Sequence, residues 1–164
     1  MTHLEAFSNQ LELEATTTRK MLACVPSEHF DWQPHPKSMS IRRLATHIAE
    51  LPTWIGMTLQ TDELDFENNP YTPKPLANTE ELLAYFEVCL QDGRKHLAEG
   101  AESALWKPWT LRSGATIYST EPKYNVIQMT ISQIIHHRAQ LGVCLRLLNI
   151  PIPGSYGPSA DESF

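Results

Sequence analysis

Four long segments of the chain repeat apolar residues at helical spacing, and this periodicity is the feature that most constrains the fold. The segments run over about residues 4–25, 40–59, 79–98 and 123–148. Pro26 ends the first segment, and Pro151 and Pro153 prevent continuation of the fourth. Pro52 lies inside the second segment and predicts a kink there, because its ring nitrogen cannot donate a hydrogen bond. Four amphipathic helices of similar length predict a four-helix bundle.

The apolar face of each segment predicts the core. The inward positions are Leu4, Phe7, Leu11, Ala15, Thr18, Leu22 and Val25 in the first segment; Ile41, Leu44, Ile48, Leu51 and Ile55 in the second; Leu82, Phe86, Cys89, Leu90 and Leu97 in the third; and Ile127, Ile131, Ile134, Leu141, Leu145 and Leu148 in the fourth. Residues on one such face bury together when helices pack side by side.

The connections between these helices are long. Residues 60–78 form a proline-rich segment, and loops of this length in compact domains are often functional. The stretch TLRSGATIY predicts a small hairpin with Ser113 and Gly114 at its turn. Residues 151–164 lack periodicity and are expected to lie on the surface or to cover another part of the protein. The expected fold class is therefore all-α: a single domain over residues 1–164, a four-helix bundle with long connections and a small hairpin between the third and fourth helices.

Composition excludes several classes of protein. The 164 residues are 41% hydrophobic and 20% charged, as in ordinary globular proteins. The net charge of −6, without a basic cluster, argues against binding to nucleic acid. We find no signal-peptide pattern and no apolar run of membrane-spanning length, so we expect a cytoplasmic protein that does not engage membranes. Cys24, Cys89 and Cys144 are odd in number and widely spaced, which predicts reduced thiols.

Two histidines lie at the edges of apolar helical faces. At about 100° per residue, His47 lies about 85° and His137 about 70° from the centre of its apolar face. Gln133 lies one turn before His137, on the same side, whereas His136 projects almost opposite the apolar face. Imidazoles that meet between two helices can bind zinc, nickel or iron and leave coordination positions open. Glu50 shares the side of His47 and could orient it, act as a base or bind the metal.

The residues alone leave other interpretations open. A histidine at the edge of a helical face is usually a hydrogen-bonded polar residue without a ligand, and the neutral amide of Gln133 is a weak metal ligand. Arg138 falls within about 35° of the apolar face of its helix. It either pairs with a carboxylate from another helix or covers apolar surface with its stem while its charged end reaches water.

Three stretches of the sequence resemble the DinB-like superfamily: FDWQPHPKSMSIRRLATHIAEL, SQIIHHRAQLGVCLRLLNI and PIPGSYGPSADE. The resemblance implies a four-helix bundle, often a homodimer, that holds a divalent metal ion, zinc or nickel, through three histidines. Two of these positions match His47 and His137. The third falls on Gln133, where this chain departs from the family pattern. The metal could then bind through His47, Gln133, His137 and water, could bind weakly, or could have been lost from a pocket that stays polar.

The resemblance also suggests an activity. Characterised relatives include thiol-dependent transferases and isomerases that use a low-molecular-weight thiol, such as bacillithiol or mycothiol. We therefore expect a metal-dependent S-transferase, or a related hydrolase, that acts on a small electrophilic substrate, with Glu50 as a base or orienting group. The alternatives are a non-catalytic module of the stress response, which binds metal or a small ligand through a degenerate site, and a purely structural dimer. A candidate dimer interface is the weakly charged helix face of Met129, Ser132, His136, Ala139 and Val143. Met129 and Val143 could equally meet the loop after the third helix.

Overall fold

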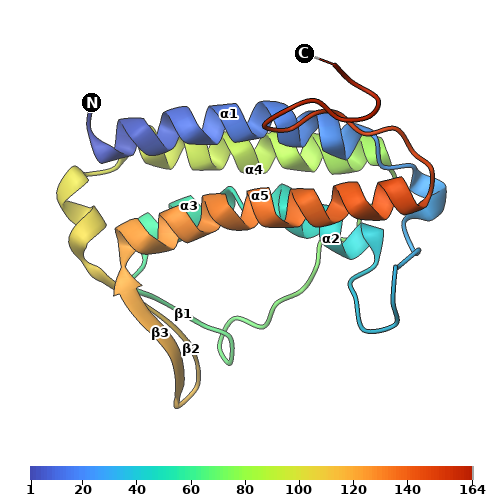
Figure 1. Ribbon diagram of the computed structural model, residues 1–164. Helices are drawn as coiled ribbons and strands as arrows, with labels where there is room; N and C mark the ends of the chain where they lie inside the picture. Colours follow the sequence, from blue (N-terminus) through green and yellow to red (C-terminus); the bar gives the residue numbers. More distant parts are fainter. Residues whose placement is uncertain (164) are drawn as a thin grey trace.

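The computed structural model describes residues 1–163 and is built on long helices (Figure 1). The helices are α1 (His3–Ala23), α2 (Ile41–Glu50), α3 (Thr53–Gln60), α4 (Thr79–Glu99) and α5 (Lys123–Leu147). Two short 3₁₀ turns, Ser27–His29 and Glu102–Trp106, lie in the connections. In Figure 1, α1 and α4 lie together on one side, and α5 lies with α2 and α3 on the other. The predicted four-helix bundle is therefore present, with its second helix in two pieces.

The core is formed by the predicted apolar faces. All of the predicted inward residues are buried except Leu148, which is half-buried at the end of α5. Each large apolar side chain removed from water in this way stabilises the fold by about 1.5–3 kcal/mol. Cys89 and Cys144 are buried, Cys24 is half-buried, and all three thiols are free. No helix within residues 1–163 is long and apolar enough to cross a membrane.

The predicted kink at Pro52 is a full break between α2 and α3. The amides of Trp54 and Ile55 donate to the carbonyls three residues earlier, so the chain tightens through Leu51 and Pro52 before α3 begins. The Thr53 hydroxyl donates to the carbonyl of Glu50, which has lost its helical partner. Helix α4 passes close to the break: a Cβ atom on Gly93 would lie 2.9 Å from the Pro52 carbonyl oxygen. Close packing of α4 thus accompanies the interruption.

The prediction of an all-α fold is wrong in one respect, because a small three-stranded sheet stands at one end of the bundle (Figure 1). Strands β2 (Pro108–Ser113) and β3 (Thr116–Pro122) form the predicted hairpin, but its turn lies at Gly114 and Ala115, one residue later than predicted. Gly114 has a positive φ of 54°, which glycine adopts without strain. Strand β1 (Glu63–Asp65), in the connection before α4, pairs with β2 in parallel. The Asp65 carboxylate accepts the Gly114 amide at 2.9 Å and so fastens the turn to β1.

Candidate metal centre

Two histidines from different helices meet at the edge of the bundle. Helix α2 carries His47 and helix α5 carries His137, and the two helices pack against each other. The ring centres lie 5.0 Å apart, with the ring planes at 68° to each other. The side chain of His47 is 21% exposed, and His137 is also half-buried. The placement expected from helical angles thus brings both imidazoles to one partly accessible position.

Each of these imidazoles uses one nitrogen for a hydrogen bond within its own helix. The Nδ1 atom of His47 lies 2.7 Å from Oε1 of Glu50, and that of His137 lies 2.8 Å from Oε1 of Gln140. A carboxylate and an amide oxygen can only accept, so each Nδ1 atom must carry the proton. In a neutral imidazole the Nε2 atom then keeps its lone pair. Metal-binding histidines are usually oriented in this way by a partner on the other nitrogen.

Electrostatics favour the neutral form of His137. Burial lowers the pKa of this imidazole, and the nearby His47 and His136 side chains lower it further, while the bond to Gln140 acts in the opposite direction. A lowered pKa leaves the ring unprotonated at neutral pH. The Nε2 lone pair of His137 is therefore available to a ligand under those conditions.

Glu50 connects the histidine pair to the long segment before α4. Its side chain is 10% exposed, and its Oε1 atom accepts the Tyr71 hydroxyl at 2.6 Å as well as the His47 imidazole. Burial and the bond to Glu50 raise the pKa of the Tyr71 hydroxyl, so this group remains a donor. The structure therefore brings together His47, Glu50 and His137, and adds Tyr71 from a segment that the sequence identified only as a long loop.

A cavity of about 440 Å³ opens beside His137. Its lining residues are Pro34, Lys37, Ser38, Met39, Leu44, His137, Gln140, Val143 and Cys144. This volume is within the range of small-molecule sites. The wall from Pro34 to Met39 carries no periodic signal, so sequence patterns gave no indication of it. Gln140 could have been found, because a residue three positions after His137 lies on the same side of the helix.

Gln133 is half-buried and forms no side-chain hydrogen bond among residues 1–163. Over the same residues, no group of three or more histidine, cysteine, aspartate or glutamate side chains is arranged to share a metal ion. His136 is exposed and projects away from the bundle, as helical geometry predicts. The candidate centre therefore offers the imidazoles of His47 and His137, with the amide side chain of Gln133 one turn away on α5.

A second polar cluster contains Arg138, which follows His137 on α5 and points about 100° away from it. The Arg138 guanidinium is 2.7 Å from the Glu14 carboxylate, and both side chains are only 2% exposed. Thr18 and Ser155 accept further hydrogen bonds from it, and the Tyr156 ring lies 5.6 Å from its carbon centre. Of the two interpretations of Arg138, the structure selects the buried ion pair.

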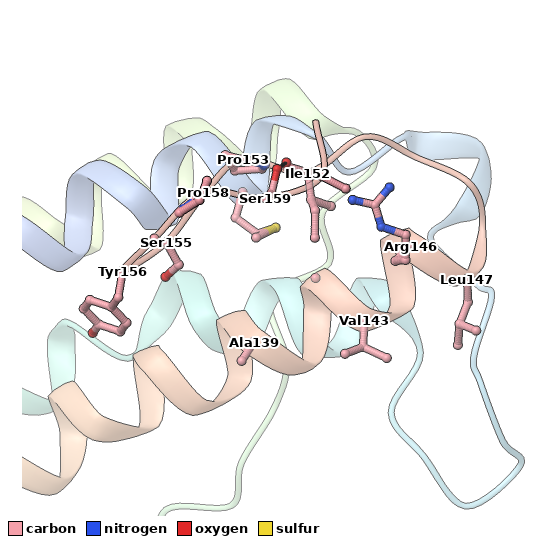
Figure 2. Close-up of a pocket in the computed structure, with 15 residues that line it drawn as sticks. Ala139, Val143, Arg146, Leu147, Ile152, Pro153, Ser155, Tyr156, Pro158 and Ser159 are labelled. Atoms are coloured by element: carbon pink, nitrogen blue, oxygen red, sulfur yellow. Dashed lines mark hydrogen bonds between the residues drawn. The ribbon is translucent and has the colours of Figure 1, made fainter. Parts of the chain in front are cut away.

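The C-terminal tail covers this ion pair and does not line the cavity beside His137. Figure 2 shows the tail running beside α5 and α1. The Tyr156 hydroxyl donates to Glu14 of α1 at 2.6 Å. Tail and helices enclose a separate groove of about 590 Å³, lined mainly by apolar groups. The charged side chain in its lining, Arg146, is paired with Asp161 of the tail. Of the expected places for the tail, the structure shows that it covers the Arg138 ion pair and not the histidine pocket.

The distance between the two imidazole rings is compatible with both rings binding one divalent metal ion. In a tetrahedral site each nitrogen lies about 2.0–2.1 Å from the ion, which places two ring centres about 5 Å apart. The ring centres of His47 and His137 are 5.0 Å apart, and both imidazoles have their Nδ1 atoms engaged elsewhere. Two imidazoles and open positions for water or substrate form a donor set suited to zinc or nickel. The fold and the site together define a helical bundle with a candidate two-histidine metal centre.

Comparison with known proteins identifies the family. The model of the DinB family matches residues 1–163, and the chain belongs to this family. It is 24% identical over 163 residues to the uncharacterised protein YrdA of Bacillus subtilis (strain 168), covering 97% of this chain and 91% of that one.

Solved structures share the fold. A DinB-like protein from Bacillus cereus ATCC 10987 superposes with a TM-score of 0.69 at 19% identity, covering 93% of this chain and 97% of that one. A family member from Exiguobacterium sibiricum 255-15 superposes with a TM-score of 0.70 at 20% identity, covering 94% and 97%. At these identities the likeness extends to the fold and not to the activity.

Proposed function

We propose that this chain is a metal-dependent enzyme: a thiol-dependent S-transferase, or a related hydrolase, acting on a small electrophilic substrate. The observation that carries the proposal is the pair His47 and His137, with ring centres 5.0 Å apart and both Nδ1 atoms hydrogen-bonded within their own helices. This arrangement leaves the Nε2 lone pairs of both rings free, and His137 lines a cavity large enough for a small molecule.

His47 and His137 would hold the ion, with Gln133 or water completing its coordination. When bound, a zinc or nickel ion lowers the pKa of a thiol and so supplies a thiolate at neutral pH. Glu50 orients His47, and its carboxylate would receive the thiol proton. The thiolate sulfur then forms a bond to the electrophilic carbon, and the leaving group departs with its electron pair and takes up that proton.

The cavity beside His137 suggests what the electrophile looks like. Leu44, Met39 and Val143 offer apolar surface, while Lys37 and Ser38 offer polar groups at the same cavity. Such a lining suits a small molecule with an apolar body and one polar or anionic end. No nucleic acid or membrane partner is proposed.

A second candidate function is a non-catalytic module that binds metal or a small ligand. It is favoured by the departure at Gln133, since residues 1–163 contain no group of three strong ligands. Such a module would keep the ion without turning over a thiol substrate. Both candidate functions use the histidine pair, but only the enzyme would convert a thiol substrate.

The test is elemental analysis and zinc titration of untagged protein, followed by a screen of low-molecular-weight thiols with electrophiles. We expect about one ion per chain, loss of that ion in His47→Ala and His137→Ala, and retention in the control His3→Ala, whose exposed side chain contacts Glu102 and Tyr124 instead. Absence of bound ion at saturating zinc or nickel overturns the metal-dependent mechanism. Bound ion without turnover across the thiol screen favours the binding module.

We also propose that two copies associate through the outer face of α5. Met129, Ser132, His136, Ala139 and Val143 are all exposed there, and none carries a fixed charge. Val143→Glu is expected to shift the protein towards monomer in sedimentation velocity, because it places a charge in this face. Val88→Glu, on the exposed face of α4, is the matched control. A monomeric parent protein, or a dimer unaffected by Val143→Glu, overturns this arrangement.

A further inference from the structure

Tyr71 reaches the candidate metal centre from outside the helices. It belongs to the connection between β1 and α4, in a stretch without regular secondary structure. Its ring lies 4.2 Å from the carbon centre of the Arg43 guanidinium, and its hydroxyl donates to Glu50 at 2.6 Å. The Nη1 atom of Arg43 is buried and has no hydrogen-bond partner among residues 1–163. The guanidinium instead lies against the face of the Tyr71 ring, a cation–π contact.

Arg43, His47 and Glu50 lie on one side of α2, because they are spaced four and three residues apart. Tyr71 contacts both Arg43 and Glu50, the first and the last of these three residues. The Tyr71 hydroxyl and the His47 imidazole donate to the same oxygen, Oε1 of Glu50. Two donors on one oxygen restrict the rotation of that carboxylate more than one donor does. The position of Glu50 thus depends on Tyr71.

Glu50 in turn determines which nitrogen of His47 carries the proton. The acceptor on one imidazole nitrogen sets the tautomer and so decides which nitrogen is free to bind. If Glu50 turns away, Nδ1 of His47 loses its acceptor and the proton can move to Nε2, the atom that must be free for a metal. Through Glu50, the Tyr71 hydroxyl therefore influences whether the Nε2 atom of His47 is free to bind a metal ion.

We propose that Tyr71 is a positioning residue, which acts through Glu50 to hold His47 with its proton on Nδ1 and its Nε2 atom free. Its bearing on metal binding rests on the function proposed above, whereas the tautomer of His47 can be measured without metal. The contact with Arg43 holds the Tyr71 ring in place, so Arg43 contributes to the same arrangement from one turn before His47.

The test compares Tyr71→Phe with Tyr118→Phe. Tyr118 is 59% exposed on β3, so its variant removes the same atom away from the site. Long-range ¹H–¹⁵N NMR of metal-free protein at a pH of about 8, where neutral imidazole predominates, reports the His47 tautomer. We expect protonation on Nδ1 in the parent and in Tyr118→Phe, and a substantial Nε2-protonated population in Tyr71→Phe. Zinc affinity should fall about 10-fold in Tyr71→Phe alone.

Three further variants test the same role of Tyr71 independently. Glu50→Gln retains an oxygen that can accept both bonds and should keep His47 protonated on Nδ1, whereas Glu50→Ala should not. Should Tyr71→Phe fail to fold, Arg43→Met removes the stacking partner and should change the tautomer in the same direction. An unchanged tautomer in well-folded Tyr71→Phe, or Nε2 protonation in the parent protein, overturns the role of Tyr71. A parent that binds no zinc yet shows the Tyr71-dependent tautomer overturns the metal-dependent function and leaves this role standing.

Discussion

His137 and Arg138 are neighbours on α5, yet they belong to two polar clusters that differ in how fully their bonding capacity is used. Arg138 is buried with Glu14, Thr18 and Ser155 as acceptors, and the C-terminal tail closes over it. His137 meets His47 at a cavity, and each ring engages only its Nδ1 atom in a hydrogen bond.

This difference separates a structural polar cluster from a candidate functional one. A buried ion pair adds little net stability compared with apolar residues, but removing one partner leaves an uncompensated charge. Removing one imidazole of the histidine pair leaves no buried charge without a partner, because both rings are partly exposed and burial favours the neutral form of His137. We therefore expect changes at Arg138 to alter folding and changes at the histidines to alter binding.

The largest effect is expected from Arg138→Met. It leaves the Glu14 carboxylate buried without its cation and should lower the free energy of unfolding by about 3–5 kcal/mol. Adding Glu14→Gln should recover part of that loss, since the second change removes the buried charge. Urea denaturation measures both, with Arg19→Met as the control: its pair with Glu87 is about 40% exposed and should cost less than about 1 kcal/mol. Equal losses at the two arginines would contradict the contrast drawn here.

Gln133→His is expected to give the next largest effect, on metal affinity. It places an imidazole one turn before His137 on α5, and imidazole is a stronger ligand for zinc than a neutral amide. We expect zinc to bind on the order of 10-fold tighter, about 1.4 kcal/mol, in competition with a chromophoric chelator. Gln128→His, on the other side of the same helix, should leave the affinity unchanged. A gain in affinity without thiol turnover in either form would favour the non-catalytic module.

Tyr156→Phe tests the tail over the ion pair and should have a smaller effect. It removes the hydroxyl that donates to Glu14 at 2.6 Å, but Gln10 and Arg138 still bind that carboxylate. Because Tyr156 is largely exposed, we expect a loss of only about 1 kcal/mol in urea denaturation. Tyr118→Phe again serves as the control. A loss as large as that of Arg138→Met would mean that the tail, and not the ion pair, dominates this region.

The helices were predictable because their cores follow a simple period, whereas the exceptions depend on contacts distant in sequence. Pro52 marked the interruption, but whether the helix kinks or breaks depends on packing such as the approach of Gly93 to the Pro52 carbonyl. Strand β1 has only three residues, and its pairing partner in β2 lies more than forty positions later. No local pattern specifies such a strand.

The candidate site divides in the same way. Helical angles predicted that His47 and His137 lie at the edges of the apolar faces, with Glu50 on the side of His47. The structure brings these three residues together. Tyr71 and the cavity wall from Pro34 to Met39 lie in aperiodic segments, so periodicity could not have indicated them. Glu14 was missed although a signal existed. It lies on the buried side of α1 between Leu11 and Thr18, where the reasoning applied to Arg138 predicts a buried carboxylate in need of a cation.

The smallest expected effect is the release of the tail by acid. Arg146 and the Ile152 amide hold the pKa of Asp161 below its ordinary value, and Lys20 and the Gly154 amide do the same for Glu162. A lowered folded-state pKa stabilises the fold above the ordinary carboxyl pKa, and this contribution disappears as the pH falls through the lowered value. The Ile152 and Gly154 amide resonances in ¹H–¹⁵N spectra should therefore shift only below a pH of about 4. Asp161→Asn should abolish the Ile152 transition and leave that of Gly154. If both amides titrate at ordinary carboxyl values, these carboxylates do not fasten the tail, and the closure of the Arg138 cluster depends on Tyr156 and Ser155 instead.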